Sequence, residues 1–405
     1  MTLTDEISSI PFEDHHVHAP EKVHQLELAG FRRPFTESAL PEVWAGPYGS
    51  QLGYRWMVRE LAKFLDVAPD EETVLAARNA YDAVAYHRML ADAANLGDAY
   101  ADYLFALDTS YHPDEWPALL GGRAVHKLLR IEVFVERLWE ECATLNDALE
   151  RLTAEISSAP AHGHVGLKSI AGYRVGLDIE VPTASQRRKA ALSYARFRRQ
   201  KADGVPTRIN DKVLVDTIVW TAFEAAAPLA LPIQFHVAFG DDDIVMTKND
   251  PSLMRALFQH APFRSVPIVL LHCYPYHRTA GYLATLYPNI YVDLGLTIPN
   301  AGHGSARILA ETLELTPVDQ LLASTDGHMI PEFQWFGIHV WRWALAKVLE
   351  EFVADGVIGA SDALPIASAV MRDNARRVYP VERSQATGAG KEVTPPPVEG
   401  QPTPL

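Results

Sequence analysis

The sequence predicts an α/β protein, a (β/α)8 TIM barrel with a long helical insertion after the first strand. Short apolar, strand-like segments alternate eight times with helix-like stretches, which is the pattern of such a barrel. A doubly wound open sheet is the competing arrangement. It would normally carry a glycine-rich turn after its first strand, but the turn here reads DHHVHAPEK. The alternation and this turn together favour the barrel.

The expected strands are apolar or β-branched runs, as suits parallel strands covered on both faces. In chain order they occupy residues 10–18, 103–110, 125–134, 163–173, 231–239, 267–274, 289–296 and 320–328. Helix-like stretches lie at 135–157, 183–228 (in at least two pieces), 251–260, 278–287, 301–314, 336–354 and 362–378.

One barrel-like domain is expected over residues 1–383, with a helical insertion at about 19–101. The insertion holds helix-like stretches at 51–65 and 71–96 together with segments rich in aromatic residues and arginine. Since it follows the first strand, it could wall or cover the barrel mouth. A packing subdomain or an oligomer contact is the alternative. The tail at 384–405 is rich in Pro, Gly and Thr and is expected to be disordered.

Composition limits the classes of protein to consider. The 405 residues carry 36 Lys+Arg and 51 Asp+Glu, a formal charge of -15, which argues against a nucleic acid or an anionic membrane as partner. Two cysteines cannot form a disulfide framework. Neither a signal peptide nor an apolar run long enough to span a membrane is seen. The expectation is a cytoplasmic protein with a small-molecule substrate.

The pair His16 and His18 gives the strongest chemical signal, at the end of the first expected strand. Side chains at i and i+2 point to the same side of a strand, so both imidazoles face one point. Two neutral imidazoles so placed can bind one divalent cation, most often Zn²⁺. Alone, the pair is a weak signal. Asp14, two residues earlier, could orient the pair or simply cap the strand.

Further residues of metal-ligand type stand at the ends of other expected strands. Lys168 ends the fourth, His236 the fifth, His272 the sixth and Asp326 the eighth. Each has an ordinary structural explanation, such as a hydrogen bond to a loop, an ion pair or a helix cap. In a barrel, however, the carboxyl ends of the strands share one mouth, where the catalytic groups of barrel enzymes lie. Five strands ending in this way predict a metal site there.

This order of residues resembles the metal-dependent amidohydrolase superfamily over roughly residues 10–380. Three segments, 166–177, 271–296 and 324–332, resemble its amidohydrolase-2 branch, and particularly the amidohydrolase domain fused to glutamine-synthetase-like proteins. The resemblance implies that His16, His18 and Asp326 bind a first metal and that His236 is also a ligand. His272 would bind a second metal, or else substrate or water. Lys168 matches the position of a carboxylated lysine that bridges two ions, and one or two ions of Zn, Mn or Fe are implied.

The function expected from these roles is hydrolysis of a C–N bond. A bound metal lowers the pKa of water to about 7, and Asp326 would carry the proton to the leaving group. The substrate would be an amide, such as a γ-glutamyl or N-acyl compound, or an amine that is deaminated. A nonoxidative decarboxylase or hydratase acting on a small carboxylic acid is the alternative. A barrel that has lost catalysis is a third reading. Relatives are often dimers or larger, so a homo-oligomer is expected.

Weaker candidates for substrate binding surround these positions. Arg130, two residues before Glu132 on the third expected strand, could clamp a carboxylate or form an internal ion pair. The others are Tyr173, Arg174, His328, Glu332 and, from the insertion, Arg55. If the substrate is anionic, its counter-charge must come from the metal and from such arginines, because the net charge of the protein is negative.

Overall fold

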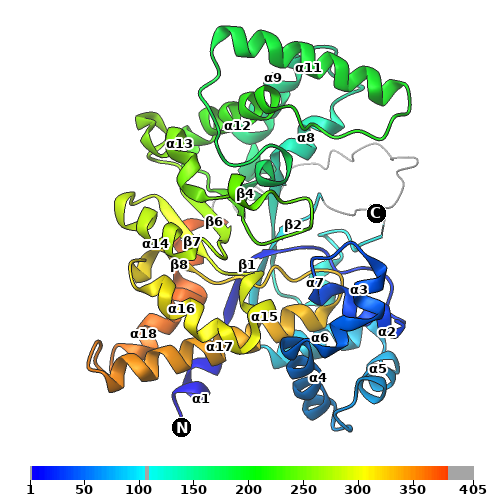
Figure 1. Ribbon diagram of the computed structural model, residues 1–405, viewed down its shortest axis with the longest axis vertical. Coiled ribbons are helices and arrows are strands. Elements are labelled where there is room, and N and C mark those ends of the chain that lie inside the picture. The colour runs from blue at the N-terminus through cyan, green and yellow to red at the C-terminus, as the bar shows by residue number, and fades with distance from the viewer. Residues whose placement is uncertain (1, 105–108, 382–405) are drawn as a thin grey trace.

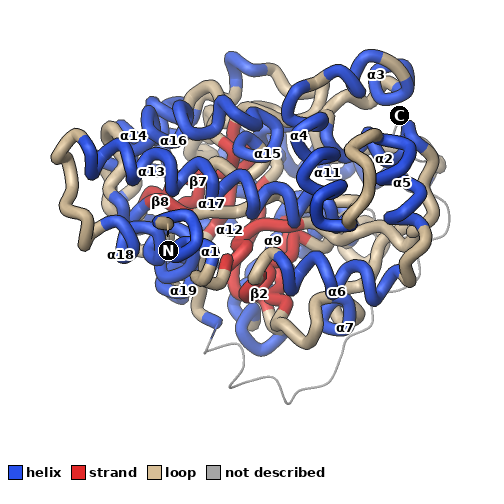
Figure 2. The backbone as a smooth tube through the Cα atoms, turned by 90° about the horizontal axis from the view of Figure 1, so that it is seen from below, coloured by secondary structure: helices blue, strands red, loops and turns tan. Residues whose placement is uncertain are grey.

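In a computed structural model, residues 2–104 and 109–381 are described, and they form the expected barrel. Eight parallel strands follow one another in sequence order, β1 to β8, and helices surround them (Figures 1 and 2). The strands are β1 Phe12–Val17, β2 Leu96–Asp102, β3 Val125–Arg130, β4 His164–Ser169, β5 Ile233–Val237, β6 Ile268–His272, β7 Ile290–Asp293 and β8 Leu321–Leu322.

Closure of the barrel between β1 and the chain after β8 depends on individual hydrogen bonds. The amide of Asp326 donates to the carbonyl of His16 (3.1 Å), and the amide of His18 donates to the carbonyl of Gly327 (2.7 Å). Asp14 adds a side-chain link, because its carboxylate accepts from the amide and the hydroxyl of Thr325 at 2.9 and 2.6 Å. Asp14 therefore ties the two ends of the sheet together.

The helices number nineteen in the described part of the chain. They are α1 Leu3–Ser8, α2 Leu28–Arg32, α3 Pro41–Ala45, α4 Leu52–Leu65, α5 Glu71–Asn79, α6 Ala83–Ala93, α7 Trp116–Leu119, α8 Ile131–Arg137, α9 Leu145–Ser157, α10 Ala171–Arg174, α11 Ala184–Ala202, α12 Lys212–Ala226, α13 Arg255–Gln259, α14 His277–Leu286, α15 Thr297–Ala301, α16 Ser305–Leu313, α17 Pro331–Ala354, α18 Ala363–Ser368 and α19 Asn374–Val378. None of them is both long and apolar enough to cross a membrane.

Local sequence explains where the main crossover helices begin and which face they bury. Thr144 and Thr183 cap α9 and α11 in capping boxes that satisfy the first free amides of each helix. In contrast, α12 is apolar on almost every face and is buried along most of its length, since it packs between α8, α9 and α11. In Figure 1 these helices form one end of the molecule.

The insertion forms helices α2 to α6, which gather on one side of the molecule beside α15 (Figure 1). In α4, Tyr54, Met57, Val58 and Leu61 are buried at a spacing of three or four residues, as in an amphipathic helix that packs on a core. Aromatic contacts join the insertion to α17: ring centroids lie 5.3 Å apart for Phe35 and Phe333 and 5.5 Å apart for Trp56 and Phe336.

Several expected strands end earlier in the structure: the segment 163–173 turns into α10 after β4, and the segment 320–328 holds only the two-residue β8. Two others differ more. The strand expected at 103–110 is wrong, because β2 ends at Asp102; residues 105–108 lie outside the described part. The segment expected as a strand at 125–134 turns into α8 at Ile131, so Glu132 is helical and does not share a strand with Arg130. The expected disordered tail also lies outside the described residues.

Candidate metal centre

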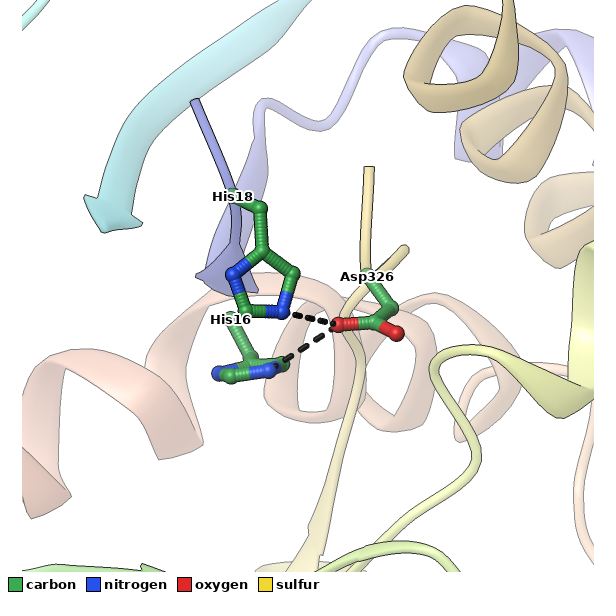
Figure 3. A group of neighbouring side chains, drawn as sticks. All are labelled: His16, His18 and Asp326. Atoms are coloured by element: carbon green, nitrogen blue, oxygen red, sulfur yellow. Dashed lines mark ion pairs between the residues drawn. The ribbon is translucent and has the colours of Figure 1, made fainter. Parts of the chain in front are cut away.

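His16 and His18 at the end of β1 face Asp326, which follows β8 (Figure 3). Oδ1 of Asp326 lies 2.9 Å from Nε2 of His16 and 3.3 Å from Nε2 of His18. The ring centroids of the two histidines are 5.1 Å apart, so the i, i+2 spacing does bring both imidazoles to one side. The three side chains form a group whose donor atoms all lie within 4.8 Å of one another.

Lys168, His236 and His272 lie against this group. Nζ of Lys168 is 3.3 Å from Nε2 of His16, and Nε2 of His272 is 3.9 Å from Oδ2 of Asp326. The rings of His236 and His272 have centroids 4.6 Å apart. The structure thus brings together all six ligand residues expected from the sequence. They lie at the carboxyl ends of β1, β4, β5 and β6 and after β8.

These residues fit a divalent metal ion. Nε2 of His236, Nε2 of His272 and Oδ1 of Asp326 are buried and make no hydrogen bond with any described residue, although buried polar atoms are normally satisfied. In a tetrahedral site with bonds of about 2.0–2.1 Å, neighbouring ligand atoms stand roughly 3.3 Å apart, close to the spacings found around Asp326. Imidazole nitrogen with carboxylate oxygen is a donor set that suits Zn, Fe or Mn.

Gly240, in the loop after β5, lets the backbone pass close against these donors. A Cβ atom at this position would stand 2.3 Å from Oη of Tyr173 and 2.5 Å from Nε2 of His236. Both distances are far below van der Waals contact, so only glycine allows the loop to approach this closely. A side chain at this position would therefore press directly against the His236 nitrogen.

Burial sets the protonation states of the cluster. It lowers the pKa of His16 to about 4, with Lys168 lowering it further, and it lowers the pKa values of His236 and His272 well below the usual range. Burial alone would raise the pKa of Asp326, but the surrounding imidazoles, His272 first, bring that pKa well below its usual value. At neutral pH His16, His236 and His272 are therefore neutral imidazoles and Asp326 is an ionised carboxylate, the forms that bind metals.

The Lys168 amine is also perturbed. Burial lowers the pKa of Lys168 to about 8, while the nearby carboxylates of Asp102 and Asp326 oppose that shift. A substantial fraction of this amine is therefore neutral near pH 8, and a neutral amine is the reactive form of lysine.

Asp102 and Asp293 contact two of the ligand residues. The carbonyl of Asp102, at the end of β2, lies 3.1 Å from Nδ1 of His18. Asp293, at the end of β7, accepts a hydrogen bond from the His272 amide at 3.2 Å. Burial alone would raise the pKa of Asp102, but Arg130 and then His18 lower it below its usual value. The Asp102 carbonyl orients the His18 imidazole in the way that partners of metal-binding histidines do.

The weaker candidates divide into two groups. Near the cluster are Tyr173, whose ring centroid is 4.2 Å from that of His236, and His328, whose Nδ1 lies 2.7 Å from the carbonyl of Asp326. Arg130 is also close, and it donates to Asp102 through both Nε and Nη2, which is the internal ion pair expected as one alternative.

Three candidates lie in other contacts. Arg174 pairs with Glu136 at 3.2 Å. Glu332 is fully buried and pairs with Arg78 of the insertion at 2.6 Å. Arg55 is exposed on α4 and its Nε donates to the carbonyl of Gly49. Arg55 and Glu332 thus contact the insertion and not the cluster, because the helix at 52–65 turns Arg55 outward and the first turn of α17 turns Glu332 toward α5.

Backbone strain accompanies the cluster. His272 and Asp326 have φ values of 68° and 55°, in the left-handed region. For residues other than glycine this conformation costs of the order of 1–3 kcal/mol, and it persists where surrounding contacts impose it, often at functional sites.

A family model described as amidohydrolase matches residues 135–381. The chain belongs to this amidohydrolase family. The resemblance expected from the sequence is therefore confirmed, and so is the barrel fold.

Individual relatives agree with this assignment. The chain is 34% identical to protein fluG of Emericella nidulans over 261 residues, which is 63% of this chain but only 29% of fluG. A Lactobacillus casei protein described as a metal-dependent hydrolase superposes with a TM-score of 0.83 at 26% identity, over 95% of this chain and 98% of that one. A uronate isomerase from Thermotoga maritima has a TM-score of 0.62 at 13% identity, over 93% and 96% of the two chains, and shows the fold alone.

Proposed function

We propose that this amidohydrolase is a metal-dependent hydrolase that cleaves a C–N bond. The observation that carries the proposal is the ionised Asp326, placed within 3.3 Å of two imidazole nitrogens in a buried cluster. A divalent ion held by His16, His18 and Asp326 would lower the pKa of water to about 7 and polarise a substrate carbonyl.

The residues of the chain supply the proton transfers. Because Asp326 is ionised at neutral pH, its carboxylate can accept the proton of the attacking water as the water oxygen bonds to the carbonyl carbon. The same carboxyl group then gives this proton to the nitrogen as the C–N bond breaks. A γ-glutamyl amide, another N-acyl compound or an amine that loses ammonia would meet this chemistry.

One observation favours the second candidate, a nonoxidative decarboxylase or hydratase. The donor group that closes within 4.8 Å contains His16, His18 and Asp326 and leaves His272 outside. A site with a single ion would leave His272 available to substrate or water. Decarboxylation needs no hydroxide, so such a site also suits that reaction.

Metal analysis and activity assays test the proposal. The purified protein is expected to hold one or two equivalents of Zn, Mn or Fe, and to hydrolyse members of a panel of γ-glutamyl amides and N-acyl amino acids. Asp326→Asn is expected to lower kcat by at least a hundredfold, whereas the matched control Asp319→Asn, on an exposed residue, leaves kcat unchanged. Carbon dioxide release from aromatic acids without any amide hydrolysis would favour the second candidate instead. Full activity in Asp326→Asn would refute its role.

A further inference from the structure

Helix α11 is rich in positive charge, although the protein as a whole is acidic. The helix holds seven of the 36 basic residues and no acidic residue, while the formal charge of the chain is -15. In Figure 1 it lies at one end of the molecule, away from the barrel strands. Its basic residues are Arg187, Arg188, Lys189, Arg196, Arg198, Arg199 and Lys201.

The helix buries one face and exposes the other. The side on which it packs against α9 and α12 is apolar. Arg188, Leu192 and Arg199 are four and then seven positions apart, so they share the opposite, outward face. All three are exposed, and Leu192 is 74% exposed. The buried residues are Ala190, Tyr194 and Phe197.

The chain itself neutralises little of this charge. Arg187 lies 3.8 Å from Glu224, with side-chain exposures of 42% and 52%, and Arg196 lies 3.2 Å from Asp211. Exposed pairs of this kind contribute at most about 1 kcal/mol each. Within residues 2–104 and 109–381, no acidic side chain pairs with Arg188, Lys189 or Arg199. These three residues, around Leu192, are the basic face of α11.

An acidic strip lies beside this helix. Arg198 donates from Nε and Nη1 to the carbonyls of Trp139 and Ala143, at 2.8 and 2.9 Å, and so holds the turn at 139–143 against α11. This turn and the outward side of α9 expose three carboxylates, which form the acidic strip. They are Glu140, Glu141 and Glu150. One surface at this end of the molecule therefore carries opposite charges side by side.

A second copy of this chain is the partner that fits such a surface. A twofold axis between the basic face and the acidic strip turns the basic face of each copy onto the acidic strip of the other, as an isologous contact requires. Nucleic acid or an anionic membrane would instead meet the acidic strip and the negative net charge together with the arginines. Charge complementarity therefore favours self-association over both.

We propose that α11 and α9 form the interface of a homodimer, in which the basic face of α11 binds the acidic strip of the second copy. This inference does not depend on the proposed hydrolase function, and it assigns a surface to the expected homo-oligomer. Helices of these lengths measure about 28 and 20 Å, and each is about 10–12 Å across. Side by side they offer roughly 500 Å² per copy, which is near the lower limit for a specific interface. The dimer is therefore weak and sensitive to salt.

Analytical ultracentrifugation of the full chain measures this dimer. Its dissociation constant is expected to rise about tenfold or more between about 50 and 500 mM NaCl, because salt screens exposed charges. The double variant Arg188→Glu with Arg199→Glu should raise the constant at least tenfold at low salt, since like charges then face each other. Arg59→Glu with Lys63→Glu is the control. It makes the same change of charge on exposed positions of α4, at the other end of the molecule, and should dimerise like wild type.

A charge swap tests the pairing itself. Glu140→Lys with Glu150→Lys should also weaken the dimer, because the basic face then meets a basic strip. Mixing this variant with Arg188→Glu, Arg199→Glu should restore dimers, since both contacts between the two variants are again attractive. Circular dichroism checks that each variant, changed only at exposed positions, is folded.

Several outcomes would overturn the inference. They are a wild-type protein that stays monomeric at low salt up to about 100 µM, a dimer that neither reversal weakens, and a mixture of the reversed variants that stays monomeric. Monomeric wild-type protein that sediments with phosphatidylserine vesicles or with a DNA duplex, and loses this binding in Arg188→Glu with Arg199→Glu, would assign the basic face to that partner and also overturn it. A protein that dimerises as expected but hydrolyses no amide would refute the hydrolase proposal alone.

Discussion

Replacing Glu332 with glutamine should weaken the attachment of the insertion to the barrel. Glu332 lies in the first turn of α17, and its carboxylate pairs with Nε of Arg78, on α5, at 2.6 Å. Both side chains are buried, at 0% and 1% exposure. The glutamine variant keeps the shape of the side chain but leaves the guanidinium charge of Arg78 without its counter-ion.

The expected loss follows from that burial. Removing one partner of a buried ion pair costs about 3–5 kcal/mol. An unfolding entropy of about 2.1 cal/mol/K per residue gives roughly 0.8 kcal/mol/K for a folded unit of this size, so Tm should fall by about 4–6 °C. The double variant Arg78→Met with Glu332→Leu should recover most of this loss, because apolar side chains of similar volume replace both charges.

Thermal unfolding followed by circular dichroism measures the difference, with Glu314→Gln as the control. Glu314 pairs with Arg278 on the surface, where side-chain exposures are 54% and 59%, and an exposed pair contributes at most about 1 kcal/mol. KM should be the same in all variants. If Glu332→Gln has the Tm of wild type but a KM raised several-fold, the reasoning is refuted and Glu332 binds substrate instead.

Three other perturbations test separate parts of the structure. Gly240→Ala should lower kcat/KM by about tenfold or more, since its new methyl group collides with the phenol of Tyr173 and the imidazole of His236. Gly304→Ala, with 4.0 Å of clearance, should leave kcat/KM unchanged. Equal activities of the two variants would contradict the need for a close approach of the loop at Gly240. Burial raises the pKa of Asp216 to about 6, so the folded state binds this proton more tightly than the unfolded state. The free energy of unfolding should therefore fall by up to about 3 kcal/mol as pH rises from about 4 to 6. Urea titrations should show a smaller dependence of the unfolding free energy on pH in Asp216→Asn. Adding Zn²⁺ at a hundred times its Kd to chelator-treated protein should stabilise it by about 2.7 kcal/mol, as measured by thermal melts. The His16→Asn variant should show no such stabilisation, while the control His112→Asn, at an exposed position, should show it in full. Stabilisation of His16→Asn by Zn²⁺ would place the metal elsewhere.

The sequence predicts the barrel and the six candidate ligand residues, because both depend on local patterns. Strands buried on two faces are near-continuous apolar runs, and the carboxyl ends of such strands meet at one mouth. A histidine or lysine that ends such a run is therefore visible without knowledge of long-range contacts, as for Lys168 and His236.

Residues outside these patterns could not be found in this way. The strand β2 reads LGDAYAD, with a glycine and two aspartates that resemble a loop, so its sequence does not predict that Asp102 ends a strand. Arg130 and Glu332 look like substrate contacts in the sequence, but each has a buried partner distant along the chain.

The seam between β1 and the chain after β8 determines when the metal centre can exist. His16 and Asp326 are separated by 310 positions (326 − 16), yet the amide of one bonds the carbonyl of the other. During synthesis the paired histidines emerge early, and their carboxylate partner is the last major ligand to be made. The complete donor set can therefore assemble only after nearly the whole barrel has been translated, so metal retention reports that the first and last strands have met.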